Sequence, residues 1–200
     1  TIMANTGLKG QEGMNKITAA LDKLNEYADM TIYNFTEMTK NIGTFTAAGL
    51  DLDTSTQAIK GIANLAAVSG STSDQASRAM YQLSQALSSG TVNLQDWNSV
   101  VNAGMGGKVF QDALLRTAKA MHTITNEQYE MIKSGKETFR NSIGSKNGTS
   151  WLNTKVLSET LKEFAGDMSE SELKAIGYTK EEIKEIQEMA DTATKAATKV

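Results

Sequence analysis

The sequence predicts an all-α fold, with a long N-terminal helix followed by a compact multi-helix bundle and a small C-terminal helical unit. None of the 200 residues is proline, whereas average usage predicts about ten in a chain of this length. Proline is excluded from helix interiors because it lacks the amide donor and clashes with the preceding turn. Apolar residues recur at helical spacings, and the segments between them carry residues typical of helix starts and stops.

The first predicted helix carries one long apolar stripe. Residues 1–13 show little periodicity, so we expect a flexible start. A helix of about 30 residues is about 45 Å long, so the stripe indicates either a coiled-coil seam or a kink near residues 29–31. Gly43 and Gly49 are the predicted stop. The stripe residues, spaced by three or four, are Met14, Ile17, Leu21, Leu24, Ala28, Ile32, Phe35, Met38, Ile42 and Phe45.

The core of the bundle is predicted over about residues 54–121. Thr54 and Thr72 each stand three residues before a glutamine. This spacing is typical of a capping box, in which the threonine accepts a hydrogen bond from the third helical amide and the glutamine reaches back. Gly70 and Gly90 follow the two helices as C-terminal caps would. The two segments therefore predict an αα-hairpin.

Further helices complete this part of the chain. Asn93 or Asp96 starts one that continues through Trp97, which we expect in the core, and that ends at the glycines of residues 104–107. Thr125, three residues before a glutamine, predicts the start of a later helix. The helix between these two, which stops near His122, is predicted from Val109, Phe110, Ala113, Leu114 and Ala118.

The end of the chain predicts a small helical unit over residues 146–200, continuing into a longer chain. Residues 145–150 are rich in glycine, serine and asparagine, so they are the predicted linker after a helical domain over residues 14–145. Ser169 and Thr179, each three residues before a glutamate, predict the last two helix starts. The final residues have no apolar stripe and would need a continuation or a partner to stay helical.

Composition excludes several function classes. The net charge of −3 argues against a nucleic-acid binder, which needs a basic face to neutralise phosphates. The absence of cysteine excludes disulfides and thiolate metal sites. No apolar run reaches the roughly 18 residues that a membrane-spanning helix needs, and the first residues lack the features of a signal peptide. Because the chain begins at Thr1, we expect a fragment of something longer.

No residue pattern predicts a catalytic, cofactor-binding or metal site. His122 is the single histidine, and a cation at a helix C-terminus explains it better than a metal ligand. Asp22, Glu26 and Asp29 share a face opposite the apolar stripe, which favours a solvated surface over acid–base chemistry. The glycines of residues 104–107 lack the Lys-Ser/Thr of a phosphate-binding loop.

Two other groups have ordinary structural interpretations. The last helix carries glutamates at spacings that fit surface ion pairs worth about 0.3 kcal/mol each, namely Glu181, Glu182, Glu185 and Glu188. Met80 is predicted in the core. Met105 is left open between a buried position and an exposed one, because glycines flank it.

Three short runs stand in a fixed order between Ile59 and Gly107. They are Gly61-Ile62-Ala63-Asn64-Leu65-Ala66, then Leu83-Ser84-Gln85-Ala86-Leu87 before Gly90, then Asp96-Trp97-Asn98 leading into Asn102-Ala103-Gly104-Met105. In this order and spacing they resemble the domain near the start of tail tape-measure proteins of long-tailed bacteriophages and prophages. The resemblance extends over about residues 40–115.

The resemblance implies a structural protein and not an enzyme. Such proteins are extended helical chains whose length sets the length of the tail tube assembled around them. The resemblance implies the tail tube protein and tail assembly chaperones as partners, and no cofactor. It places the chain in the host cytoplasm during assembly and in the tail tube lumen of the finished virion. It also implies that the chain leaves through the tail at infection. Helix breakers at Gly43, Gly70, Gly90 and Gly104 predict either a folded head domain or helices that open out inside the tube.

Two alternatives remain at this stage. One is an oligomeric helical adaptor unrelated to tails, in which copies of the chain associate through the stripe from Met14 to Phe45. The other is an enzyme, since some tape-measure proteins carry cell-wall-degrading domains elsewhere in the chain. Against an enzyme, this sequence has no Cys/His pair and no glutamate in a cleft-like setting.

Overall fold

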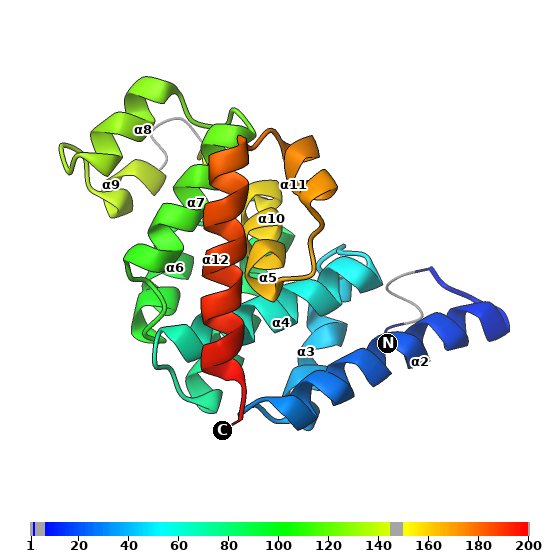
Figure 1. The fold of residues 1–200 in the computed structure, drawn as a ribbon. Helices are drawn as coiled ribbons and strands as arrows, with labels where there is room; N and C mark the ends of the chain where they lie inside the picture. Colours follow the sequence, from blue (N-terminus) through cyan, green and yellow to red (C-terminus); the bar gives the residue numbers. More distant parts are fainter. Residues whose placement is uncertain (1, 3–6, 145–149, 200) are drawn as a thin grey trace.

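The computed structural model describes residues 2, 7–144 and 150–199, and its regular elements in these ranges are all helices (Figure 1). The all-α prediction is therefore confirmed, including the long N-terminal helix. The helices are α2 (Gly10–Met30), α3 (Phe35–Ala47), α4 (Leu52–Val68), α5 (Ser73–Ser89), α6 (Leu94–Asn102), α7 (Lys108–Ala120), α8 (Asn126–Lys133), α9 (Phe139–Ile143), α10 (Thr154–Ala165), α11 (Glu170–Ile176) and α12 (Lys180–Ala197).

The N-terminal stripe is divided between two helices. The α2 helix ends at Met30, and α3 begins after Asn34, whose side chain accepts hydrogen bonds from two amides of the first turn. The alternative of a break near residues 29–31 is therefore confirmed. The prediction that Gly43 ends the helix is wrong, because Gly43 lies inside α3 between fully buried apolar side chains. A glycine inside a helix costs only about 0.5–1 kcal/mol, which burial of its neighbours outweighs. The chain turns instead at Gly49, where φ is +100°.

Most of the stripe faces the interior of this same chain. Met14 and Ile32 are about half exposed, at 48% and 51%. Contact between copies through the stripe stays a prediction, and among the stripe side chains that the structure describes these two are the exposed ones. The buried members are Ile17, Leu24, Ala28, Met38, Ile42 and Phe45.

Local capping chemistry sets most helix starts as predicted. The exception is α4, whose N-cap is Asp51 and not Thr54. The Asp51 carboxylate accepts the Thr54 amide at 2.7 Å, so the helix starts three residues earlier and Thr54 lies in its first turn. The reciprocal capping box forms at Thr72, Asn93, Ser169 and Thr179, while Thr125 accepts the Gln128 amide.

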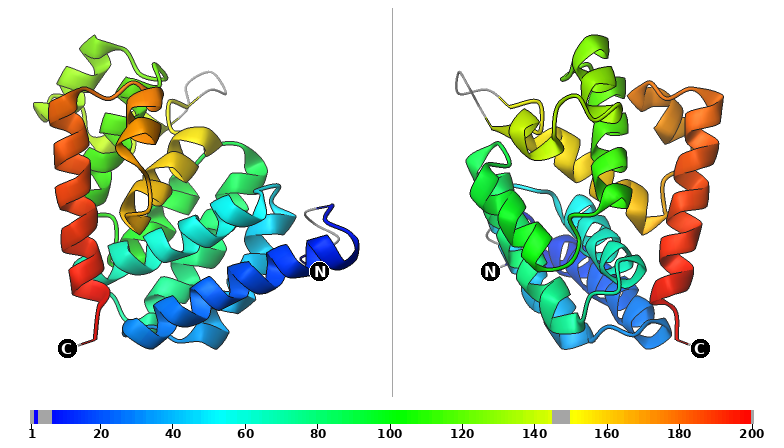
Figure 2. Two further views of the ribbon diagram at one scale, coloured as in Figure 1. Left: turned by 45° about the vertical axis from the view of Figure 1, so that its right-hand side comes forward. Right: turned by 90° about the vertical axis from the view of Figure 1, so that its left-hand side faces the viewer.

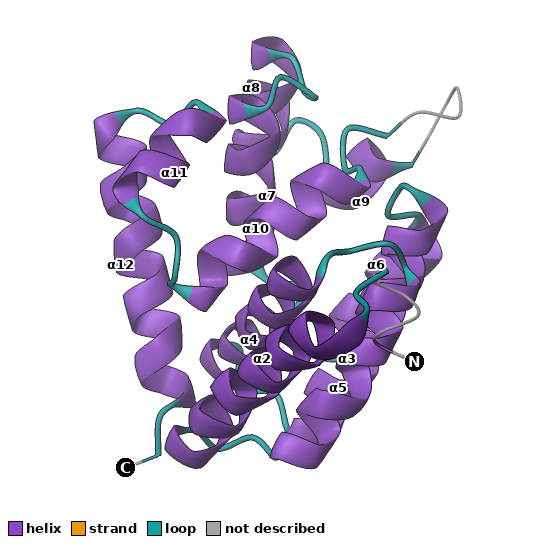
Figure 3. Cartoon of the chain, turned by 90° about the vertical axis from the view of Figure 1, so that its right-hand side faces the viewer, coloured by secondary structure: helices purple, strands orange, loops and turns teal. Residues whose placement is uncertain are grey.

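The α4 helix is the centre of the molecule. It contacts α2, α3, α5, α10 and α12. Figure 3 shows α2, α3, α4 and α5 as a stack, with α12 along one edge. The two views of Figure 2 place α6 to α9 on the other side of α10 from α2 and α3. One hydrophobic cluster joins side chains from Leu24 to Phe164 with Ala193 and Ala197 of α12, and a second small cluster lies around α11.

Aromatic rings fill the junction of α6, α7, α9 and α10. Trp97 stacks on Phe110 with ring centroids 5.9 Å apart, and it lies 4.6 Å from Phe139. Trp97 is 3% exposed, so its predicted core position is confirmed. Met105 is fully buried, which settles the position that the sequence left open.

The predicted domain boundary is only partly within the described structure. Residues 145–149 of the predicted linker lie outside the described residues, as do residue 1 and residues 3–6 of the predicted flexible start. The first helix after the linker, α10, packs closely against α4. The division of the chain into residues 14–145 and 146–200 stays a prediction.

Candidate functional site

The titratable residues singled out from the sequence do not gather into a site. Asp22, Glu26 and Asp29 are exposed on α2. His122 is exposed after α7, at φ +61°, and its amide donates to the Lys119 carbonyl. Within residues 2, 7–144 and 150–199, no three His, Cys, Asp or Glu side chains lie close enough to hold a metal ion.

The structure instead assembles a buried polar cluster where α7, α10 and the loop before α12 meet. The Tyr178 hydroxyl lies 2.6 Å from Glu163 Oε2 and 2.9 Å from Thr117 Oγ1. Thr160 Oγ1 lies 2.7 Å from Thr117 Oγ1, and both threonines also donate to carbonyls of their own helices. Glu163 is only 1% exposed. These four residues, which we call the Glu163 cluster, join three segments that are distant in sequence.

Burial dominates the electrostatics of this cluster. Removal from water penalises the charged carboxylate and raises the pKa of Glu163 from 4.5 to about 8, although the hydrogen bond from Tyr178 and the charge of Arg116 oppose the shift. Glu163 Oε1 has no hydrogen-bond partner among the described residues. At neutral pH the side chain is therefore held mainly as the neutral acid.

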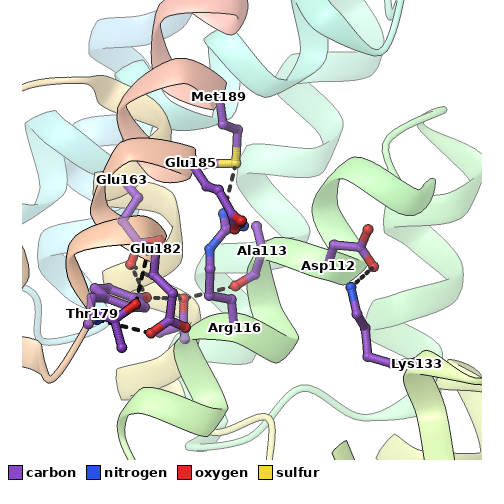
Figure 4. A network of polar contacts seen from close by, with 11 residues as sticks. Asp112, Ala113, Arg116, Lys133, Glu163, Thr179, Glu182, Glu185 and Met189 are labelled. Carbon is purple, nitrogen blue, oxygen red and sulfur yellow. Dashed lines mark hydrogen bonds and ion pairs between the residues drawn. The ribbon is translucent and has the colours of Figure 1, made fainter. Parts of the chain in front are cut away.

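Arg116 of α7, the residue before Thr117, contacts α12, as Figure 4 shows. Its Nη1 lies 3.7 Å from Glu185 Oε2, and its Nη2 lies 3.3 Å from the sulfur of Met189. Arg116 is largely buried while Glu185 is mostly exposed. Such a half-solvated pair contributes little to stability, because water screens the charge of the exposed partner.

A second buried polar contact lies near the C-terminal end of α12. Asn64 of α4 is fully buried, and its Oδ1 accepts a short hydrogen bond from the Tyr27 hydroxyl. Its Nδ2 donates to the Phe164 carbonyl at 2.9 Å and to Thr194 Oγ1 at 3.3 Å. One amide side chain therefore connects α2, α4, α10 and α12.

The variant Tyr27→Phe tests the value of this contact. It removes one hydroxyl and leaves Asn64 Oδ1 buried without a donor, so we expect the free energy of unfolding to fall by about 1–2 kcal/mol. Urea denaturation followed by circular dichroism measures this change. Tyr81→Phe is the matched control, because Tyr81 is 52% exposed, and it should leave stability unchanged. Equal stability of both variants would contradict the assigned role of Asn64.

The geometry favours a structural role over a chemical one. A catalytic acid must reach its substrate, whereas Glu163 is enclosed by α7, α10 and Tyr178. A cavity of about 510 Å³ lies between α3, α5 and α6, and one of about 580 Å³ lies between α2, α4 and α10, but other residues line both. The cluster holds helices together.

Sequence reasoning did not single out these residues. The available signal was weak: Val156, Thr160 and Glu163 are spaced by four and three residues, so they share one face of α10. A glutamate at such a position is usually exposed, and only the fold brings Tyr178 over it.

Comparison with known proteins gives a family match. No curated protein and no solved structure matches the chain. Within the described residues, no helix is long and apolar enough to cross a membrane. A family model described as tape measure protein matches residues 8–181, which span α2 to the start of α12. The match covers most of the chain, including the helices that form the Glu163 cluster, and so the chain belongs to the tape measure protein family.

Proposed function

We propose that this chain is a folded part of the ruler that sets tail tube length during assembly and that leaves through the tail at infection. The single observation that carries the proposal is the family match over residues 8–181. We propose the tail tube lumen as its place in the virion and the host cytoplasm as its place during assembly. Tail tube protein and tail assembly chaperones are the proposed partners.

The physical mechanism of a ruler is geometric. A helix rises about 1.5 Å per residue, so 174 residues in one straight helix would span about 260 Å. In the structure the chain reverses at turns with positive φ, such as Gly49, Gly90 and Gly104. The folded chain therefore spans much less than its straight length. Its contribution to tube length depends on whether these helices open out in the tail.

Tail length in a deletion variant tests the proposal. In a phage whose tape measure contains this chain, residues 8–181 are deleted in frame, and tails are measured by electron microscopy. We expect shorter tubes, because the ruler has lost part of its length. Shortening by about 260 Å supports a chain that is straight in the tail. A smaller shortening supports a ruler segment that stays folded.

The control restores length without restoring sequence. An unrelated straight coiled-coil segment of 174 residues replaces the deleted one, and it should lengthen the tube by about 260 Å relative to the deletion variant. Tubes of unchanged length in the deletion variant would overturn the proposed contribution of this segment to length.

A further inference from the structure

The C-terminal helices α11 and α12 form a unit with its own small core. Leu173 of α11, Tyr178 of the connecting loop and Ile183 and Ile186 of α12 form an apolar cluster separate from the main one. The unit follows a non-helical segment that begins at Gly166, where φ is +79°. Ala120 of α7 also packs against this cluster, so separation of the unit breaks that contact and keeps the packing among the four residues of the unit itself.

The α12 side chains that are fully buried in the main cluster are small, and the larger Met189 is only partly buried against it. Ala193 and Ala197 are fully buried in the main cluster and Ala190 is 5% exposed. Buried apolar area sets hydrophobic stabilisation, and an alanine side chain contributes one methyl group. To the same cluster α4 and α10 instead contribute large, fully buried side chains such as Leu65 and Phe164. By the size of its fully buried side chains, α12 is therefore held more weakly than α4 and α10 are.

Polar contacts supply the rest of the attachment, at three heights along α12. Near its start Tyr178 donates to Glu163, and lower down Asn64 donates to Thr194. At the C-terminal end of α12, residues 30–32 and 197–199 form an antiparallel bridge. The Ile32 amide donates to the Ala197 carbonyl, and the Lys199 amide donates to the Met30 carbonyl, both at 2.9 Å. Such groups regain hydrogen bonds from water after separation, so their net contribution is small.

The joint before the unit contacts α4. Lys60 of α4 pairs with Asp167 at 2.5 Å, in the segment between α10 and α11. This contact places the chain just before the unit beside the central helix, although Asp167 is half exposed and the pair adds little stability. Separation of α11 and α12 therefore requires rotation only within the residues between Asp167 and the start of α11, and the packing of α10 on α4 is left intact.

We infer that α11 and α12 detach from the rest of the chain as one unit, more often than the chain unfolds globally, while α2 to α10 stay folded. The small buried side chains of α12, the separate small cluster and the joint after α10 together define the moving part. Its helices α11 and α12 are drawn in orange and red in Figure 2. Detachment exposes the faces of α4 and α10 that α12 covers. This inference concerns only the order in which the chain opens, and it holds whether or not the chain acts as a ruler.

The charges around the Glu163 cluster favour the same movement. Glu163 gains water on separation, and its pKa returns from about 8 toward 4.5, so detachment becomes easier as pH rises through this interval. Arg116 of α7 lowers the pKa of the buried carboxyl, and Glu159 of α10 raises it. From α12, Glu185 faces Arg116 and partly neutralises it.

Native-state hydrogen exchange on the full 200-residue chain tests the inference. At low denaturant we expect amides of α11 and α12 to exchange together, at least about tenfold faster than amides of α4 and α10, with a smaller dependence on denaturant. Equal protection and equal denaturant dependence in all four helices would show that only global unfolding occurs, and would overturn the inference.

An engineered disulfide separates detachment from local fraying. Thr31 and Thr198 face each other in a non-hydrogen-bonded antiparallel pair, with an expected Cα separation of about 4.5 Å, which a disulfide spans. The chain has no cysteine, so the pair Thr31→Cys and Thr198→Cys forms a single bond. Oxidation should slow α12 exchange about tenfold, and reduction should restore the wild-type rate. Equal exchange in the oxidised and reduced protein would show that the C-terminal end of α12 does not separate from residues 30–32, and would overturn the inference.

Discussion

Replacing Gly61 by alanine is expected to lower the free energy of unfolding by about 3 kcal/mol, at the upper end of the usual cost of overpacking. Gly61 is buried where α4 crosses α10, and a Cβ atom there would lie 1.8 Å from the Leu161 carbonyl oxygen and 2.8 Å from its carbon. These are backbone atoms of a helix, so they cannot move aside as a flexible side chain can. The two central helices would have to separate.

Thermal and urea unfolding measure this loss. For a chain of this size, 3 kcal/mol corresponds to a fall in Tm of about 6–12 °C. Gly43→Ala is the matched control, because Gly43 lies inside α3 and a Cβ atom there would meet nothing within 4 Å. It should raise stability by about 0.5–1 kcal/mol, the helix penalty of glycine. Equal effects of the two substitutions would contradict the close approach of α4 and α10.

The second large expected effect is a fall in the free energy of unfolding as pH rises, caused mainly by Glu163. The folded chain keeps the Glu163 proton up to about pH 8, whereas the unfolded chain releases it near pH 4.5. The unfolded state therefore binds fewer protons within this interval. The stabilisation that comes from proton binding by folded Glu163 is present in full below about pH 4.5. It falls by up to about 1.4 kcal/mol per pH unit and is lost as pH passes about 8.

The variant Glu163→Gln removes the titration and keeps the shape of the side chain. We expect its free energy of unfolding to lose this slope between pH 4.5 and 8, and to exceed that of the wild type near pH 8. Urea denaturation at several pH values measures both slopes. Glu188→Gln, which removes an exposed glutamate of α12, should keep the wild-type slope. A wild-type slope in Glu163→Gln would contradict the raised pKa.

The comparison of sequence and structure separates local from long-range causes. Helix starts at Thr72, Asn93, Ser169 and Thr179 follow from contacts within three residues, so the sequence predicts them. The predicted start of α4 at Thr54 is wrong because Asp51, an equally good acceptor three residues earlier, is the N-cap.

The sequence by itself determined that this chain is helical, where most of its helices begin and end, and the family to which it belongs. The helical character and the helix ends depend on proline exclusion, on apolar spacing and on capping, and each of these acts within about one helical turn. The family rests instead on the match over residues 8–181. Only the tertiary structure decided that Glu163 is buried, that Met105 lies in the core and that Gly61 has no room for a Cβ atom. Those outcomes depend on residues such as Leu161 and Tyr178 that lie far away in the chain. The α4–α10 hydrogen bond between Asn64 and Phe164 joins residues 100 positions apart, and no local pattern specifies such a contact.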